Sequence, residues 1–166
     1  IELCADSDDW NWDGVEFRFL QSSLDYSSEN DNSCVLQIRS SRGSVLLPED
    51  IETQAEAQLA ISYAGELASD VLLAPHHGSR SSSSYAFLKR VDPDFVVFSA
   101  GYRNSFGHPH DRVVTRYGEF ASKTLNTAEA EMISFEFSEG FSDTGVPENQ
   151  IIHIREYRKL NSRYWH

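Results

Sequence analysis

The sequence is poor in the features that a membrane segment or an export signal needs. Its apolar runs, such as Phe95–Phe98, are far too short to cross a bilayer. Residues 1–4 (Ile-Glu-Leu-Cys) contain no charged-then-apolar leader and do not resemble a signal peptide. The first residue is not Met, which leaves open an origin within a larger membrane protein.

Positive charge is also scarce. The chain has 14 Lys and Arg against 26 Asp and Glu, a formal net charge of −12. A duplex-binding surface normally concentrates Lys and Arg, because phosphate neutralisation supplies most of its affinity. The balance therefore argues against tight, passive DNA binding by this chain alone, and it is compatible with binding divalent cations. The basic residues are scattered, apart from one late group: Arg155, Arg158, Lys159 and Arg163.

The two cysteines, Cys4 and Cys34, lie far from every histidine in the sequence. A metal–thiolate site would need closer clustering of Cys and His, so this kind of site is disfavoured. The residues alone leave two alternatives open: a pair of buried thiols, or a disulfide formed in an oxidising compartment.

What the sequence does contain is the composition of a folded domain. Its 166 residues are 40% hydrophobic and 12% aromatic, which are globular values that argue against general disorder. The length fits a single domain, residues 1–166, with a substantial core.

The order of predicted elements indicates an α/β layered domain. Alternating or continuous apolar runs predict strands, and Ala/Glu/Leu-rich or capped segments predict helices between them. Residues 42–43 are expected to turn a hairpin, and residues 21–32 to form a loop. The predicted strands are residues 15–20, 34–38, 44–47, 71–74, 95–98, 132–137 and 151–157, and the predicted helices are residues 52–67, 81–90 and 109–122.

Three polar clusters follow the carboxyl ends of predicted strands. They are residues 48–50 (Pro-Glu-Asp), 75–79 (Pro-His-His-Gly-Ser) and 104–110 (Asn-Ser-Phe-Gly-His-Pro-His). Ligands of α/β sheets bind outside these strand ends, so the three loops are expected to converge on one site. Carboxylate and imidazole are ligands of zinc and manganese, which activate water for hydrolysis.

Each cluster also has a purely structural interpretation. An Asp after a strand is more often a helix cap than a ligand, and Asp50 could cap a helix that begins near residue 52. A His-His pair such as His76 and His77 is more often a structural or surface feature. We interpret His110 and His153 as surface or packing residues.

The spaced combination of these segments resembles a known family. Residues 46–52 (LLPEDIE), 72–79 (LLAPHHGS) and 104–109 (NSFGHP) look like the late motifs of the metallo-β-lactamase-like domain of ComEC-type competence proteins. Those proteins are DNA-internalisation channels of the bacterial inner membrane. Cys4, residues 10–15 (WNWDGV) and residues 32–36 (NSCVL) also resemble them, so the similarity spans nearly the whole chain.

The resemblance implies a metallo-β-lactamase-like αββα fold and a metal-dependent nuclease that degrades the non-transported DNA strand. It places this domain in the periplasm, attached to the channel portion of the same polypeptide, with Cys4 and Cys34 as a disulfide. Water activated by a divalent ion, Zn or Mn, would attack phosphorus. The implied metal ligands are Asp50, His77 and His108; the catalytic candidates are His76 and His77; the substrate-binding candidates are Ser79 and Asn104.

Two departures from the family pattern are evident. Glu49 stands where the family usually has Gly, which tolerates backbone angles that Glu resists. The early His-x-His-x-Asp-His motif is absent, so the chain corresponds to the later portion of the domain and is expected to be inactive in isolation. The alternatives are a catalytically silent DNA-guiding or interaction domain of the same channel, or another activity on this fold, such as phosphorylcholine ester or lactone hydrolysis.

Overall fold

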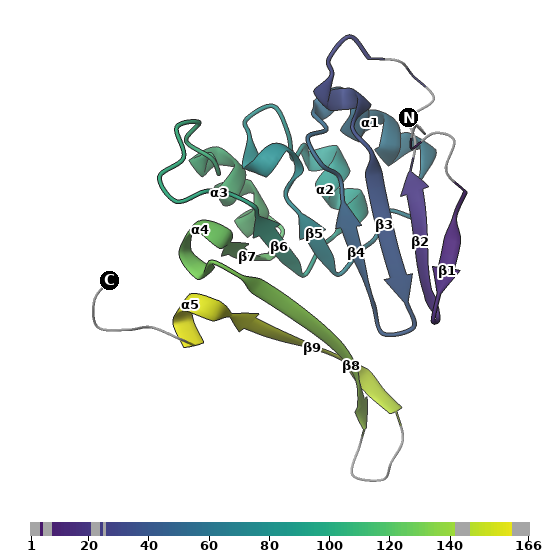
Figure 1. Ribbon diagram of the computed structural model, residues 1–166. Helices are drawn as coiled ribbons and strands as arrows, with labels where there is room; N and C mark the ends of the chain where they lie inside the picture. The colour runs from purple at the N-terminus through teal and green to yellow at the C-terminus, as the bar shows by residue number, and fades with distance from the viewer. Residues whose placement is uncertain (1–3, 5–7, 21–23, 25, 142–146, 161–166) are drawn as a thin grey trace.

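The computed structural model describes residues 4, 8–20, 24, 26–141 and 147–160 and contains a mixed seven-stranded sheet. The strands lie in the same order in space as in the sequence (Figure 1). Pairing is antiparallel from β1 to β4 and parallel from β4 to β7. The strands are β1 Trp10–Trp12, β2 Val15–Leu20, β3 Val35–Ser40, β4 Gly43–Leu47, β5 Val71–Leu73, β6 Phe95–Phe98 and β7 Lys123–Asn126.

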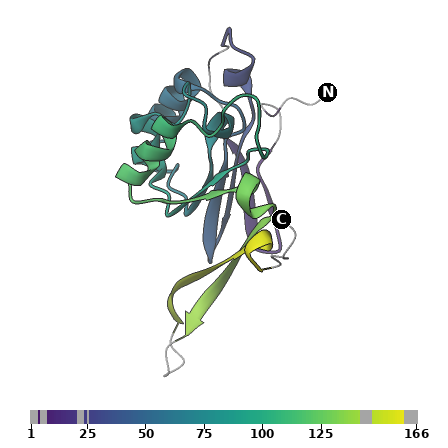
Figure 2. The ribbon, with the colours of Figure 1, turned by 90° about the vertical axis from the view of Figure 1, so that its left-hand side faces the viewer.

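Three helices cover one face of this sheet (Figure 2). They are α1 Thr53–Ser62, α2 Tyr85–Val91 and α3 Asp111–Glu119, and 3-10 turns lie at η2 Asn30–Asn32 and η3 Pro75–Gly78. Alternate residues of the strands face these helices. Leu46, Leu72 and Val96 are among those that are fully buried there. Burial of this apolar area is the main stabilising contribution to the fold.

A hairpin packs against part of the opposite face. It consists of β8 Ile133–Phe141 and β9 Pro147–Glu156, flanked by the short helices α4 Thr127–Ala130 and α5 Tyr157–Leu160. Its apolar residues meet β5, β6 and β7 in a second hydrophobic cluster, in which the rings of Phe95 and Phe135 lie 6.0 Å apart. The described residues therefore form a helix layer, a large sheet and a partial second β-layer.

The predicted α/β class is confirmed, and each predicted strand and helix is present with adjusted ends. Two strands were missed. β1 has only three residues, which is too short for a clear pattern. β7 lies at the edge of the sheet, and Leu125 is its one apolar core residue. The αββα arrangement of the metallo-β-lactamase fold stays a prediction.

Each predicted helix has a limit that the structure places two or more residues away. The first helix ends at Ser62, not at residue 67, because the chain turns at Tyr63; Leu67 is buried from the loop that follows. The second begins at Tyr85, where the Ser84 hydroxyl accepts a hydrogen bond from the Phe87 amide. The third begins at Asp111 and not at Pro109, because the imidazole of His110 caps it.

The structure pairs Cys4 with Cys34 as a disulfide, with Cα atoms 5.9 Å apart. The cap of α1 also comes from this part of the chain. The Oδ1 atom of buried Asp31 accepts hydrogen bonds from the amides of Glu52, at 2.8 Å, and Ala55, at 3.2 Å. The loop before β3 is thereby joined to the beginning of α1.

Replacing Asp31 by Ala is expected to lower the free energy of unfolding by about 1–3 kcal/mol, because two helix amides lose their acceptor. Chemical denaturation followed by circular dichroism measures the change. The exposed Asp94 provides a matched control, since the same substitution there removes a carboxylate that caps no helix. Equal stability of the two variants would contradict the capping role.

Candidate functional site

The loops that follow β4, β5 and β6 meet at the carboxyl ends of these parallel strands. The backbone amide of His76 donates to the carbonyl of Glu49 at 2.9 Å, and the amide of His110 donates to the carbonyl of Gly78 at 3.0 Å. The three polar clusters found in the sequence therefore touch each other through the main chain. The structure brings together the loops expected to converge.

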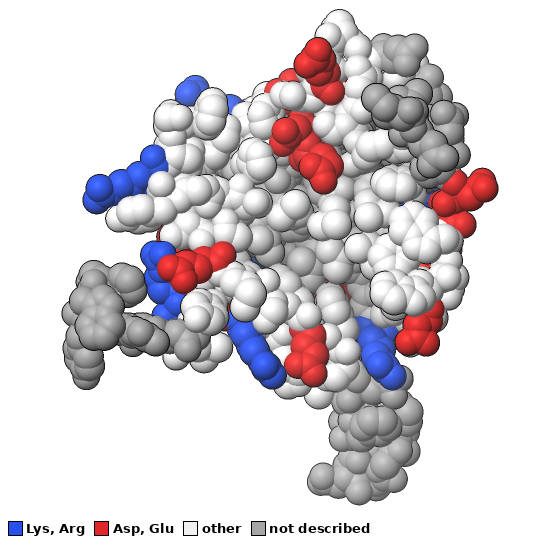
Figure 3. Space-filling view, viewed as in Figure 1, with Lys and Arg blue, Asp and Glu red and all other residues white. Residues whose placement is uncertain are grey.

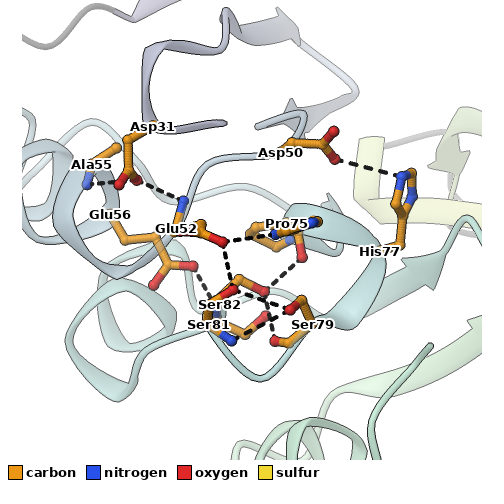
Figure 4. Close-up of polar contacts among 12 residues, drawn as sticks. Asp31, Asp50, Glu52, Ala55, Glu56, Pro75, His77, Ser79, Ser81 and Ser82 are labelled. Carbon is orange, nitrogen blue, oxygen red and sulfur yellow. Dashed lines mark hydrogen bonds and ion pairs between the residues drawn. The ribbon is translucent and has the colours of Figure 1, made fainter. Parts of the chain in front are cut away.

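Two carboxylates and three imidazoles lie near one another at these loops: Asp50, Glu52, His76, His77 and His108. The Nε2 atom of His77 lies 3.5 Å from Oδ1 of Asp50, and Figure 4 shows the two side chains facing one another. The Nδ1 atom of His76 lies 3.2 Å from Oε1 of Glu52. The ring of His108 lies 5.8 Å from that of His76, centroid to centroid.

Glu52 is a residue of this site that the sequence did not identify. It lies two residues after Asp50 and has an extended backbone, with φ −114° and ψ −174°. A second carboxylate at alternate spacing from a candidate ligand was the signal that could have identified it. Its carboxylate is bound by the hydroxyl of Ser81 at 2.7 Å, which holds it beside His76.

Asp50 is not a helix cap, because Asp31 occupies that role. The side chain of Asp50 is about half exposed, at 43%, and so is that of His77, at 50%. This disfavours the structural interpretation of Asp50 and leaves its carboxylate available to a ligand. The predicted role of Asp50 as a metal ligand stays a prediction.

A serine-rich loop supports the carboxylate of Glu52 (Figure 4). The hydroxyl of Ser81 donates to Glu52, so the 3.1 Å contact between Ser79 and Ser81 is a hydrogen bond donated by Ser79. The hydroxyl of Ser82 donates to the carbonyl of Pro75 at 2.7 Å, which fixes the start of the histidine loop. Ser79, a predicted substrate contact, thus uses its proton inside the loop network.

Asn104, the other predicted substrate contact, holds the loop that carries His108. Its side-chain amide donates to the carbonyls of Gly101, at 3.2 Å, and His108, at 2.6 Å, and its oxygen accepts from the His108 amide at 3.0 Å. Both donor hydrogens are therefore used. In this geometry Asn104 positions His108, and a bond to phosphate would require one of these contacts to break.

The backbone around the site adopts left-handed conformations at three residues that are not glycine. The φ angles are 53° at Glu49, 47° at His76 and 55° at His77. Such angles cost about 1–2 kcal/mol per residue for L-amino acids and persist where the surroundings impose them. Glu49 stands where the family that the sequence resembles usually has Gly. The positive φ of Glu49 agrees with this, because Gly adopts such angles without strain.

Gly78 allows the histidine loop to approach its neighbours closely. Its φ is +84°, and a Cβ atom there would lie 2.8 Å from ring carbons of Phe98 and from Cβ of Pro109. The loop after β5 is thus pressed between the end of β6 and the loop before α3. No larger side chain fits without displacing one of them.

The electrostatic environment favours neutral His108. Partial burial lowers the pKa of His108 below its ordinary value, and the neighbouring His76, His77 and His110 lower it further, against the opposing effect of Asp50. The Nδ1 atom of His108 is buried and makes no hydrogen bond among the described residues, whereas that of His76 contacts the carboxylate of Glu52. A neutral imidazole with an unpartnered nitrogen, as at His108, is suited to coordinating a metal.

The donor chemistry fits zinc or manganese, yet the described residues hold no group of three His, Cys, Asp or Glu side chains placed to bind one ion. The candidate ligands approach each other in pairs, Asp50 with His77 and Glu52 with His76.

A cavity of about 400 Å³ lies at the other end of the strands and contains none of the candidate residues. It is lined by the β1–β2 and β3–β4 turns together with Phe137 of β8. We find no helix among the described parts of the chain that is long and apolar enough to span a bilayer.

The chain is similar to proteins named for competence and recombination. It is 38% identical over 132 residues to competence protein ComA of Neisseria gonorrhoeae, which covers 79% of this chain and 19% of that protein. It is 33% identical over 136 residues to recombination protein 2 of Haemophilus influenzae (81% and 17%), and 28% identical over 124 residues to ComE operon protein 3 of Bacillus subtilis (74% and 16%). No family model matches the chain.

These similarities support a relationship to the competence and DNA-uptake proteins, in agreement with the resemblance found in the sequence motifs. The chain spans less than a fifth of the length of each of these relatives.

Replacing Glu49 by Gly is expected to stabilise the protein relative to Glu49→Ala by about 1 kcal/mol, because only Gly relieves the left-handed backbone angle. Both variants remove the same carboxylate, so the comparison isolates the backbone effect. Thermal and denaturant unfolding measure it. Equal stability of the Gly and Ala variants would show that the angle at position 49 carries no strain.

Stability is expected to fall as the pH decreases below the ordinary histidine pKa of 6.5, in part because of His108. Its folded pKa is lower than its unfolded pKa, so the unfolded state binds the proton more tightly. The contribution of His108 is therefore complete above the unfolded pKa and is lost as the pH falls through the folded pKa. Denaturant unfolding across this range should show a smaller pH dependence for His108→Gln than for the wild type. The same change at exposed His153 should leave the wild-type dependence unaltered; an unaltered dependence in His108→Gln would refute the assignment.

Proposed function

We propose that this chain is the later portion of a metal-dependent phosphodiesterase or nuclease domain in a bacterial DNA-uptake protein. The observation that supports it best is the meeting of Asp50, His76, His77 and His108 at the carboxyl ends of parallel strands, where α/β proteins bind ligands. The names of the relatives supply the biological setting, competence and recombination.

The proposal includes a metallo-β-lactamase-like αββα arrangement of which this chain forms one part. One face of β1 to β4 supports it. The strand register places Phe17, Ile38 and Val45 on the same face of the sheet as the hairpin. All three side chains are only half-buried, and Trp12 on the neighbouring strand is 73% exposed. An apolar face of this extent is suited to covering by a further β-layer.

Each residue of the site has a distinct proposed role. Asp50, His77 and His108 would hold a Zn or Mn ion, together with ligands from the early motif that these residues lack. When bound, the ion supplies Lewis-acid activation of water and of the phosphate. His76 is oriented by its contact with Glu52. In this proposal its ring would donate a hydrogen bond to a phosphate oxygen.

The setting of the domain follows from the relationship and is also a proposal. The domain would lie in the periplasm, tethered to the membrane channel of the same polypeptide, and act on the DNA strand that is not transported. The Cys4–Cys34 disulfide supports an oxidising compartment. The oligomeric state is left open.

A second function, a catalytically silent domain that guides DNA through the same channel, is favoured by one observation. The described residues hold no complete metal-binding group, and the exposed Glu49 adds negative charge beside Asp50, where phosphate would bind. A silent domain would retain the loop geometry as a structural remnant.

The decisive experiment compares hydrolysis of single-stranded DNA by this chain and by a version extended at its N-terminus through the early motif, with added Mn²⁺ or Zn²⁺. The extended protein is expected to cleave in the presence of metal, and the present chain to be nearly inactive. Asp50→Ala and His108→Ala in the extended protein should each reduce the rate by at least about 100-fold.

Matched controls are Asp94→Ala and His153→Gln, which remove the same residue types away from the site and should keep full activity. Circular dichroism verifies that all variants are folded. Full activity in both Asp50→Ala and His108→Ala would remove the site assignment. A folded, metal-loaded extended protein without activity would favour the silent domain.

A further inference from the structure

The loop between β6 and α3 exposes large aromatic rings at the edge of the candidate site. Phe106 is 81% exposed and Tyr102 is 68% exposed, and Arg103 lies between them in the sequence. We refer to Tyr102, Arg103 and Phe106 as the aromatic rim. None of the three belongs to either hydrophobic cluster of the fold.

Two other exposed aromatic residues, Tyr85 and Trp10, contact neighbouring helices or strands of the fold. Tyr85, also more than half exposed, donates its hydroxyl to Glu119 at 2.8 Å and lies beneath the guanidinium of Arg116. Trp10 stacks on Phe17 as part of the sheet face. Phe106, by contrast, leaves most of its ring in solvent, where an apolar surface is unfavourable.

The ring of Phe106 is oriented toward the histidines. It stacks on the imidazole of His108 with centroids 6.0 Å apart and planes only 16° from parallel. His108 in turn lies 5.8 Å from the ring of His76. A flat group placed on the free side of Phe106 would extend this row of rings from solvent into the candidate site.

The loop that presents the aromatic rim is held by its own hydrogen bonds. The amide of Asn104 donates to Gly101 and the amide of Gly107 donates to Asn104, at 3.2 and 3.4 Å. The side chain of Asn104 binds both main-chain polar groups of His108. The position of Phe106 relative to His108 is therefore defined before a ligand binds, which reduces the entropic cost of binding.

The local charge is also suited to a phosphodiester. Residues 99–110 contain Arg103 and no Asp or Glu, although the whole chain carries a net charge of −12. Some Lys and Arg side chains stand at the upper left of the face in Figure 3, on the side where α3 and its preceding loop lie in Figure 1, and others lie along its lower part. The guanidinium of Arg103 lies 5.2 Å from the centre of the Tyr102 ring, so charge and aromatic surface occur together.

We propose that the aromatic rim binds an unpaired nucleobase adjacent to the phosphate at the candidate site, with the base stacked on Phe106 and Arg103 near the backbone. This inference rests on the proposed function and narrows its substrate to single-stranded nucleic acid. Stacking on an aromatic side chain tolerates any base but requires a free base face, which a duplex does not offer.

The test measures binding of three fluorescent ligands of equal length by anisotropy, in low salt and without added metal. They are a single-stranded oligonucleotide, the same strand with abasic sites, and the duplex. The wild-type chain should bind the base-bearing single strand most tightly. Phe106→Ala should weaken that binding by about 5-fold or more, since each stacked base contributes roughly 1–3 kcal/mol.

Phe106→Trp should retain wild-type affinity, because it preserves the stacking surface. Affinity for the abasic strand should be the same in all variants. Trp12→Ala is the matched control, since it removes an equally exposed aromatic ring far along the chain and should leave binding unchanged. Because Phe106 is exposed, its replacement should leave the fold intact, and circular dichroism verifies that each variant is folded.

Three results would overturn the proposal: no preference of the wild type for the base-bearing strand, equal affinities of Phe106→Ala and wild type, or no measurable binding of the single strand. The outcome is separate from that of the hydrolysis assay. A stacking preference in this chain, together with an extended protein that is folded, metal-loaded and inactive, would support the aromatic rim and refute catalysis. An active extended protein whose binding is indifferent to Phe106→Ala would do the opposite.

Discussion

The close approach at Gly78 is the contact on which the arrangement of the site depends. There is no room for a Cβ atom between this residue, the ring of Phe98 and Pro109. The carbonyl of Gly78 accepts the amide of His110, and two residues earlier the amide of His76 donates to Glu49. Because these bonds lie within a few residues of each other, the loops after three different strands have little freedom to move apart.

Behind these loops lies a buried polar network that holds the serine-rich segment in place. Glu56 of α1 is fully buried and accepts the backbone amides of Ser83 and Ser84, and burial raises its pKa. The hydroxyl of Ser83 is hydrogen-bonded to that of Tyr117 in α3 at 2.9 Å. Such a network is costly to leave partly satisfied, so it specifies one loop conformation. That conformation positions Ser81 and, through it, Glu52 beside His76.

The carboxylates and imidazoles of the candidate site are arranged in pairs. Asp50 with His77 and Glu52 with His76 are preorganised by the fold, while the residues described here do not complete a metal-binding group. Under the proposed function, the remaining ligands would come from the early motif, and further structure would cover the half-buried apolar face of β1 to β4. The exposed Phe106 lies at the open edge of the same site, where a substrate would enter.

The amino-acid sequence by itself determined the α/β class, the main strands and the three polar loops, because hydrophobic periodicity and turn residues are local signals. It also predicted that the loops carrying Asp50, the histidine pair and His108 converge, and the structure brings these loops together. Only the tertiary structure decided that Asp31 caps α1, that Asn104 holds His108, and that Glu52 faces His76. These contacts join residues whose distances depend on how helices and loops pack, and no local pattern in the sequence records that packing.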